Sequence, residues 1–128
     1  MGLSDYRVLP AIAVSDMDRA REFYEGKLGL TSMGERPDGG IRYACGEGSS
    51  IHVYPSPANA GKSTATLAGF AVGDVEATVD GLIANGVVFE QYDIGPIKTD
   101  EKGVAQFGDA KSAWFKDPDG NIISVNEE

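Results

Sequence analysis

The sequence feature that most constrains the fold is an internal repeat. Ala11–Leu30 and Gly69–Val88 follow one plan: an apolar strand, Ala-Val, a small residue, Asp, an amphipathic helix, a glycine and a second apolar strand. Aligning Val14 with Val72 also brings the Asp before each helix into register. Self-similarity of this kind indicates two copies of one supersecondary unit, neither of which buries its apolar surface alone. We therefore expect two modules that combine.

Each helix is expected to have one buried face. The first is capped by Ser15 or Asp16, and the second opens at Gly73 or Asp74 and closes at Gly86. Glycines punctuate the short strands that follow each helix. In the first half these strands are predicted at residues 31–34, 41–45 and 50–54; in the second half they are predicted at 87–92, at either 104–107 or 111–116, and at 121–126.

Both halves therefore have the order β-α-β-β-β, and the predicted fold class is α+β. At 128 residues the chain is expected to be a single domain, 1–128. Module one covers about residues 5–55, a linker 56–64, and module two about 65–127. Tyr92–Lys111 is long, irregular and punctuated by glycine, and loops of this length are often lids.

Composition excludes several function classes. A formal net charge of −9 argues against nucleic-acid and anionic-membrane binding, both of which need a basic face. The single cysteine, Cys45, excludes an internal disulfide framework and fits a reducing compartment. The first ten residues lack a signal-peptide pattern, and no apolar run reaches membrane-spanning length. We expect a soluble, cytoplasmic protein.

Two segments carry a family resemblance. VSDMDRAREFYEGKLGL, residues 14–30, contains an Asp-led helix with Phe-Tyr and a Leu-Gly ending, and DPDGN, residues 117–121, precedes the last strand. With the paired β-α-β-β-β plan, they resemble the vicinal oxygen chelate superfamily of glyoxalase I, extradiol dioxygenases and bleomycin-resistance proteins. The resemblance covers essentially the whole chain. It implies a cupped mixed β-sheet around a cavity, helices on the outer side, and a homodimer.

The resemblance also locates the positions where metal-binding members carry their ligands. In this chain those positions hold Leu9, His52, Leu67 and Ser124. Leucine has no lone pair to offer, and a serine hydroxyl is a poor ligand without charged partners. One histidine does not hold a catalytic metal. We therefore expect no metal site and no cofactor.

His52 has two interpretations. It is either a structural or exposed histidine, or a hydrogen-bonding or proton-transfer group in the cavity, and so a candidate catalytic residue. No carboxylate or thiol nearby in the sequence is an obvious partner for it. Tyr54 shares its face by strand alternation. Trp114 and Phe115 point to opposite faces of their strand, and which of them enters the cavity is left open.

Three functions compete. The first is a metal-dependent lyase, isomerase or dioxygenase, and the second a metal-free enzyme that uses His52. The third is a metal-free binding protein, similar to bleomycin-resistance proteins, that holds an aromatic or drug-like small molecule in an apolar cavity. We favour the binding protein and keep as the alternative a glyoxalase-like enzyme, metal-free or with a non-standard metal site. The predicted ligand-binding residues are Leu9, His52, Tyr54, Leu67, Trp114 and Ser124.

Overall fold

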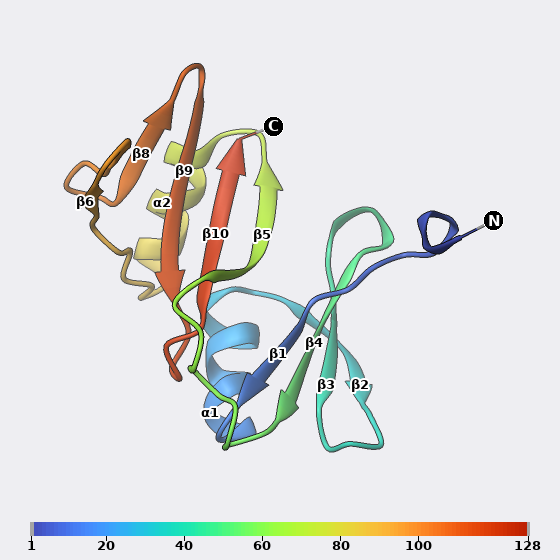
Figure 1. The fold of residues 1–128 in the computed structure, drawn as a ribbon. Helices are drawn as coiled ribbons and strands as arrows, with labels where there is room; N and C mark the ends of the chain where they lie inside the picture. Colours follow the sequence, from blue (N-terminus) through green and yellow to red (C-terminus); the bar gives the residue numbers. More distant parts are fainter. Residues whose placement is uncertain (1, 128) are drawn as a thin grey trace. The chain divides into compact units, whose positions relative to one another are not determined.

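The structure, a computed structural model, describes residues 2–127. The chain divides into two compact units, the first ending at Gly61 and the second beginning at Lys62. Each unit contains a four-stranded sheet, with a helix between its first and second strands (Figure 1). The α+β prediction is confirmed. No helix among residues 2–127 is both long and apolar enough to cross a membrane.

The first unit has the predicted β-α-β-β-β order. Its strands are β1 (Ala11–Val14), β2 (Thr31–Glu35), β3 (Ile41–Ala44) and β4 (Ser50–Pro55), and its 3-10 helices are η1 (Leu3–Asp5) and η3 (Gly46–Gly48). The spatial order is β1-β4-β3-β2. Strand β4 pairs in parallel with β1 and antiparallel with β3. The last strand of the unit is therefore a central one.

The helix of the first unit changes type along its length. Helix α1 covers Met17–Arg21 and continues as the wider π-helix η2 at Glu22–Lys27. Of the two caps that the sequence allows, Asp16 is the one used, since its carboxylate accepts from the N–H groups of Asp18 and Arg19 at 2.9 and 3.2 Å. The predicted amphipathic helix is present, with Phe23 and Tyr24 on its buried face, and its second half is a π-helix in place of an α-helix.

Packing against β3 accounts for the wider turn. The Leu28 N–H donates to the Phe23 carbonyl, five residues back, at 2.9 Å. The buried rings of Tyr24 and Tyr43 stack with centroids 6.0 Å apart. The Tyr43 hydroxyl donates to Glu25 at 2.8 Å. Burial, and next this bond, raise the pKa of Tyr43, so the hydroxyl keeps the proton that it donates.

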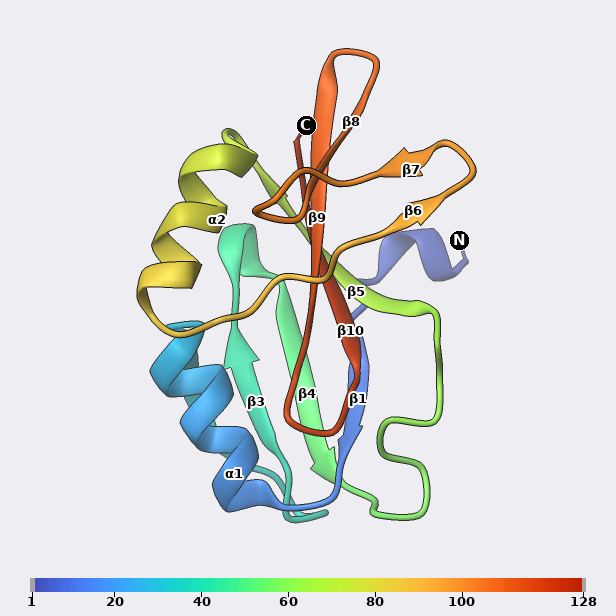
Figure 2. The ribbon, with the colours of Figure 1, turned by 90° about the vertical axis from the view of Figure 1, so that its left-hand side faces the viewer.

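The second unit repeats the same connectivity. Its elements are β5 (Thr66–Val72), α2 (Val75–Ala84), β6 (Asp93–Ile94), β7 (Ile97–Lys98), β8 (Val104–Phe107), β9 (Ala110–Lys116) and β10 (Ile122–Glu127). The main sheet has the order β5-β10-β9-β8, so its last strand is again central. Asp74 caps α2 by accepting from the Ala77 N–H at 3.0 Å. Figure 2 shows the small β6–β7 hairpin, in orange, apart from the main sheet.

Three predictions for the second unit are corrected. Residues 87–92, predicted as a strand, form one bridge, from Phe89 to Phe115, because β8 already pairs with β9 from Ala110 to Ala113. The sequence predicts one strand, at either 104–107 or 111–116; both ranges are strands, β8 and β9, and they form an antiparallel hairpin. The stretch predicted to be irregular, Tyr92–Lys111, contains β6, β7 and β8.

The DPDGN segment is a turn held by its own side chains, as its composition predicts. The buried Asp117 carboxylate accepts from the backbone N–H groups of Asp119 and Asn121, each at 2.9 Å, and from the Asn121 side-chain amide at 2.9 Å. Gly120 has a φ of 92°, which a side chain would disfavour. The turn chemistry accounts for both aspartates without a catalytic role.

Candidate functional site

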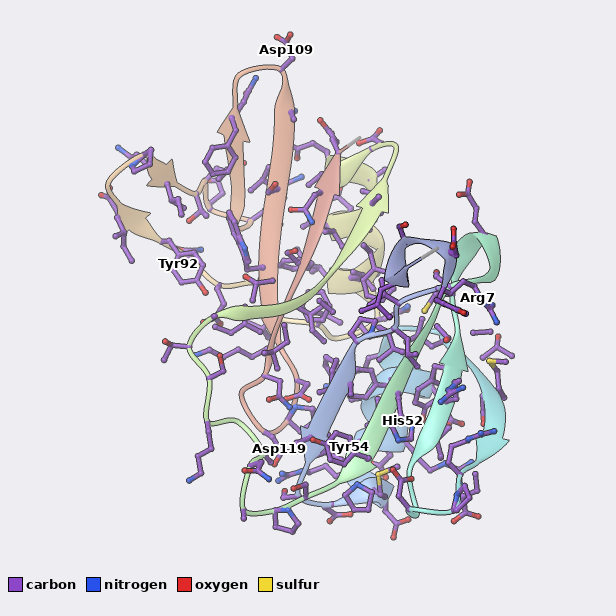
Figure 3. All side chains as sticks on the ribbon, turned by 45° about the vertical axis from the view of Figure 1, so that its right-hand side comes forward. Arg7, His52, Tyr54, Tyr92, Asp109 and Asp119 are labelled. Atoms are coloured by element: carbon purple, nitrogen blue, oxygen red, sulfur yellow. The ribbon has the colours of Figure 1, made fainter. Side chains whose placement is uncertain are left out.

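Side chains on β4 alternate between the two faces of the first sheet. Ile51 and Val53 are buried in the apolar core, and His52 and Tyr54 are half-buried on the opposite face. The two rings stack with centroids 5.7 Å apart and planes 7° apart (Figure 3). Arg42 on β3 lies directly opposite His52 in the strand register. We call Arg42, His52 and Tyr54 the first polar face.

A carboxylate that the sequence analysis missed contacts His52. The Oδ2 of Asp38, in the turn between β2 and β3, lies 2.7 Å from His52 Nε2. A carboxylate only accepts, so Nε2 carries the proton. The bond from His52, followed by one from the Gly40 N–H at 2.8 Å, lowers the pKa of Asp38. The imidazole is thus oriented by an ionised carboxylate.

The contact was hidden because Asp38 and His52 lie 14 residues apart. One local signal was present, the Asp-Gly-Gly turn that follows β2. A Cβ on Gly40 would lie 2.5 Å from the Val53 carbonyl oxygen and 2.9 Å from the Tyr54 Cα. Glycine is required there because the turn closes directly onto β4. This close approach carries Asp38 to the histidine.

Two buried polar atoms of the first polar face have no hydrogen-bond partner. They are His52 Nδ1 and Arg42 Nε, and no other buried side-chain nitrogen or oxygen in residues 2–127 shares this condition. Both belong to one cross-strand pair. Buried polar groups in folded proteins are generally satisfied, so an unsatisfied neighbouring pair is a mark of strain or of a ligand site.

A hollow of about 270 Å³ adjoins Arg42. Its lining comes from the segment before β1, from β3, and from the turn that leads into β4; the residues are Tyr6, Arg7, Val8, Leu9, Arg42, Gly48, Ser49 and Ser50. Leu9, a predicted ligand-binding residue, therefore lines a cavity within the first unit. Figure 3 labels Arg7, whose Nη1 donates to the Gly48 carbonyl at 2.6 Å.

The second sheet carries an aromatic group on the face away from Phe115. Phe115 is buried, with its ring 5.5 Å from that of Phe89. Trp114 is half-buried, with the rings of Tyr92 and Phe107 edge-on at 5.6 and 6.3 Å. Of the two aromatics, Phe115 therefore belongs to the core and Trp114 lies on the other face of the sheet.

Ser124 lies opposite Trp114 in the β9–β10 register and is buried. Its hydroxyl accepts from the Asn126 side-chain amide at 2.9 Å. A Cβ on Gly69, its neighbour on β5, would lie 2.8 Å from both side chains, so the glycine leaves room for this hydrogen bond. We call Trp114, Ser124 and Asn126 the second polar face.

The donor atoms at the positions where the resemblance implies metal ligands do not fit a metal ion. His52 has its Nε2 bonded to Asp38 and its Nδ1 buried. Leu9 and Leu67 offer no donor atom, and the Ser124 hydroxyl is already an acceptor for Asn126. In residues 2–127 no group of three or more His, Cys, Asp or Glu side chains could hold a metal ion. Leu67 itself lies on β5, 37% exposed, beside a register shift against β10.

The six predicted ligand-binding residues thus fall into two sets, three in each unit. A model of the Glyoxalase/Bleomycin resistance protein/Dioxygenase superfamily matches residues 8–125. The chain belongs to this superfamily. Its membership confirms the resemblance expected from the repeat, the Asp-led helix and the DPDGN turn. That the six residues line one common cavity stays a prediction.

Solved structures are similar over 94% or more of this chain. TnmS3, described as an antibiotic binding protein from Streptomyces sp. CB03234, is 26% identical, with a TM-score of 0.72 over 95% of this chain and 95% of that one. A glyoxalase/bleomycin resistance protein from the same organism is 25% identical, with a TM-score of 0.71 over 94% and 99%. One from Catenulispora Acidiphila DSM 44928, 23% identical with a TM-score of 0.66 over 95% and 97%, shares the fold. No curated protein matches the sequence.

Proposed function

We propose that this protein binds an aromatic, drug-like small molecule without a metal ion and releases it chemically unchanged. The observation that carries the proposal is the surface of Trp114, which is half-buried and held edge-on by Tyr92 and Phe107. Similarity to an antibiotic binding protein supports the same function. Aromatic side chains with a few fixed polar groups are the usual composition of small-molecule sites.

Part of the half-buried Trp114 side chain stays exposed beside the rings of Tyr92 and Phe107, whose planes lie at 66° and 85° to that of the indole. A flat ligand that stacks on the exposed part gains dispersion and removes apolar surface from water. Burial raises the pKa of Tyr92, so its hydroxyl stays protonated and is able to donate. Recognition then depends on shape and stacking, with few directional bonds.

The test uses the single tryptophan of the chain as its reporter. Flat aromatic natural products and glycopeptide antibiotics are titrated into the protein while Trp114 fluorescence and the melting temperature are followed. We expect quenching, a higher melting temperature, and recovery of the unchanged compound by mass spectrometry. By calorimetry, Trp114→Leu should weaken binding at least tenfold, and Met33→Leu, a change at an exposed apolar residue of the first unit outside the hollow, should not.

An enzyme that uses His52 is the second candidate, and the Asp38 contact is what favours it. An imidazole oriented by a carboxylate is the arrangement that general bases use. Its remaining nitrogen, Nδ1, is buried and has no partner, so a substrate reaches it only if the surrounding side chains move. If mass spectrometry recovers a product in place of the added compound, and His52→Ala abolishes its formation, the binding proposal is wrong and the metal-free enzyme replaces it.

A further inference from the structure

The hollow of the first unit has a charge composition unlike that of the whole chain. The protein has 20 acidic and 11 basic residues. The hollow is lined by two arginines, Arg7 and Arg42, and by no carboxylate. Two guanidinium groups that share a hollow repel each other and lose part of their hydration, unless an anion lies between them.

The side chain of Arg42 lacks a hydrogen-bond acceptor within the described part of the chain. No residue in the described range 2–127 accepts a hydrogen bond from its side chain or forms an ion pair with it. Its Nε is buried, so water does not replace the missing acceptor. A buried cationic donor without an acceptor is destabilising in the free protein. A carboxylate is the acceptor that best matches the planar donor edge of a guanidinium.

Arg7 and the turn before β4 supply further donors. One Arg7 nitrogen is held by the Gly48 carbonyl at 2.6 Å, which fixes the group and leaves its other N–H groups for a second acceptor. The Ser49 hydroxyl is engaged with the Gly46 carbonyl at 2.6 Å, and Ser50 adds a hydroxyl to the lining. These donors all come from segments at one end of the first sheet.

The lining also includes three mainly apolar side chains, those of Tyr6, Val8 and Leu9. A volume of about 270 Å³ lies just below the range for small-molecule sites, roughly 300 to 1,000 Å³. The occupant that fits is therefore small, with one anionic end and one apolar end.

We propose that this hollow binds a small organic carboxylate, with the carboxylate on Arg42 and Arg7 and the hydrocarbon part against Tyr6, Val8 and Leu9. The inference goes beyond the proposed function, because it concerns residues of the first unit alone and does not depend on Trp114. Binding gives the terminal amino groups of Arg42 an acceptor, and it also removes part of the apolar lining from water.

The experiment is a titration of the isotope-labelled full chain with benzoate, followed through the backbone amide signals of Gly48, Ser49 and Ser50. We expect saturable shifts at these amides. Arg42→Gln should weaken binding at least tenfold, Arg7→Gln less, and Arg42→Lys should restore part of the affinity by returning the charge without the planar donor edge. Arg36→Gln, which removes the same charge from an exposed position outside the hollow, is the matched control and should leave the affinity unchanged.

Three ligands and one variant decide the outcome. Benzamide, which has the same shape without the charge, should bind at least tenfold more weakly, and equal binding would overturn the proposal. Inorganic phosphate should also bind more weakly than benzoate. Equal binding of the two would mean that the hollow is a general anion site and not a site for organic carboxylates. Absence of shifts with benzoate at millimolar concentration, or unchanged affinity in a folded Arg42→Gln variant, would likewise overturn it. Binding of aromatic drugs is measured in a separate experiment, by Trp114 fluorescence. Failure of the carboxylate proposal is therefore distinguishable from failure of the proposed function.

Discussion

The two sheets have the same strand order, yet their polar faces differ in how completely they are satisfied. On the first, Arg42 Nε and His52 Nδ1 are buried without a partner. On the second, the buried Ser124 hydroxyl is bonded to Asn126, and Trp114 is surrounded by aromatic rings. The first face is charged and incomplete in the protein alone, whereas the second is aromatic and internally complete.

The shared features lie elsewhere in the repeat. Both helices begin at an Asp cap, Asp16 and Asp74, and both sheets place their last strand at the centre. Helix caps and the buried sheet face determine whether a module folds, so the two modules share these features. Alternate residues of each strand project to the sheet face opposite the core, where a substitution changes the surface without changing the core. The comparison teaches that one scaffold carries two unlike surfaces.

The largest effect should come from the glycines that border the two faces. Gly40→Ala puts a Cβ against backbone atoms of Val53 and Tyr54, which do not move independently of the sheet. We expect a loss of about 3 kcal/mol in unfolding free energy, at the upper end for overpacking. Gly69→Ala meets the side chains of Asn126 and Ser124 and should cost about 1 kcal/mol.

Denaturant unfolding measures both glycine variants, with Gly46→Ala as the control. Gly46 has open space around its Cβ position, so we expect a change within roughly 0.5 kcal/mol. Equal losses for Gly40→Ala and Gly69→Ala would contradict the view that the first face is fixed by backbone and the second by side chains.

A smaller effect should distinguish satisfied from unsatisfied polar groups. Ser124→Ala removes the acceptor of the Asn126 amide, and we expect it to cost about 1 to 2 kcal/mol of unfolding free energy. Arg42→Met removes a buried donor that has no partner to lose, so in the absence of ligand we expect no loss, or a gain of up to about 1 kcal/mol. Thermal melts of the two variants give the comparison, and a marked destabilisation by Arg42→Met would contradict it.

The smallest effect is in the pH dependence and belongs to the first face alone. The pKa of Asp38 is lowered in the folded state, first by His52. A lowered carboxyl pKa stabilises the fold above the ordinary value of about 4, and this stability is lost as the pH falls through the lowered value. The melting-temperature difference between the wild type and Asp38→Asn should therefore shrink from pH 6 towards pH 2. For Ser124→Ala the difference should stay constant over this range, because neither Ser124 nor Asn126 titrates.

Local patterns were enough to predict the two modules, a cap at Ser15 or Asp16 for the first helix, and the DPDGN turn. Each depends on residues close together in the sequence, so periodicity and turn chemistry reveal them. The contact of Asp38 with His52 and the unsatisfied Arg42 depend on strand register, which one sequence does not specify. The strand predicted at 87–92 failed for the same reason, because β8 competes for the edge of β9. Homodimer formation and a common cavity stay predictions.

The central position of β4 and of β10 has a consequence for the order in which the protein acquires structure during synthesis. In each unit the strand made last lies between strands made earlier, so the sheet is not complete until that strand is available. The first unit has all its strands once Pro55 has left the ribosome, and the second acquires its central strand only with residues 122–127. Domains generally fold as units from the N-terminus during synthesis. All the strands that carry the first polar face are therefore available while much of the second unit is still unmade.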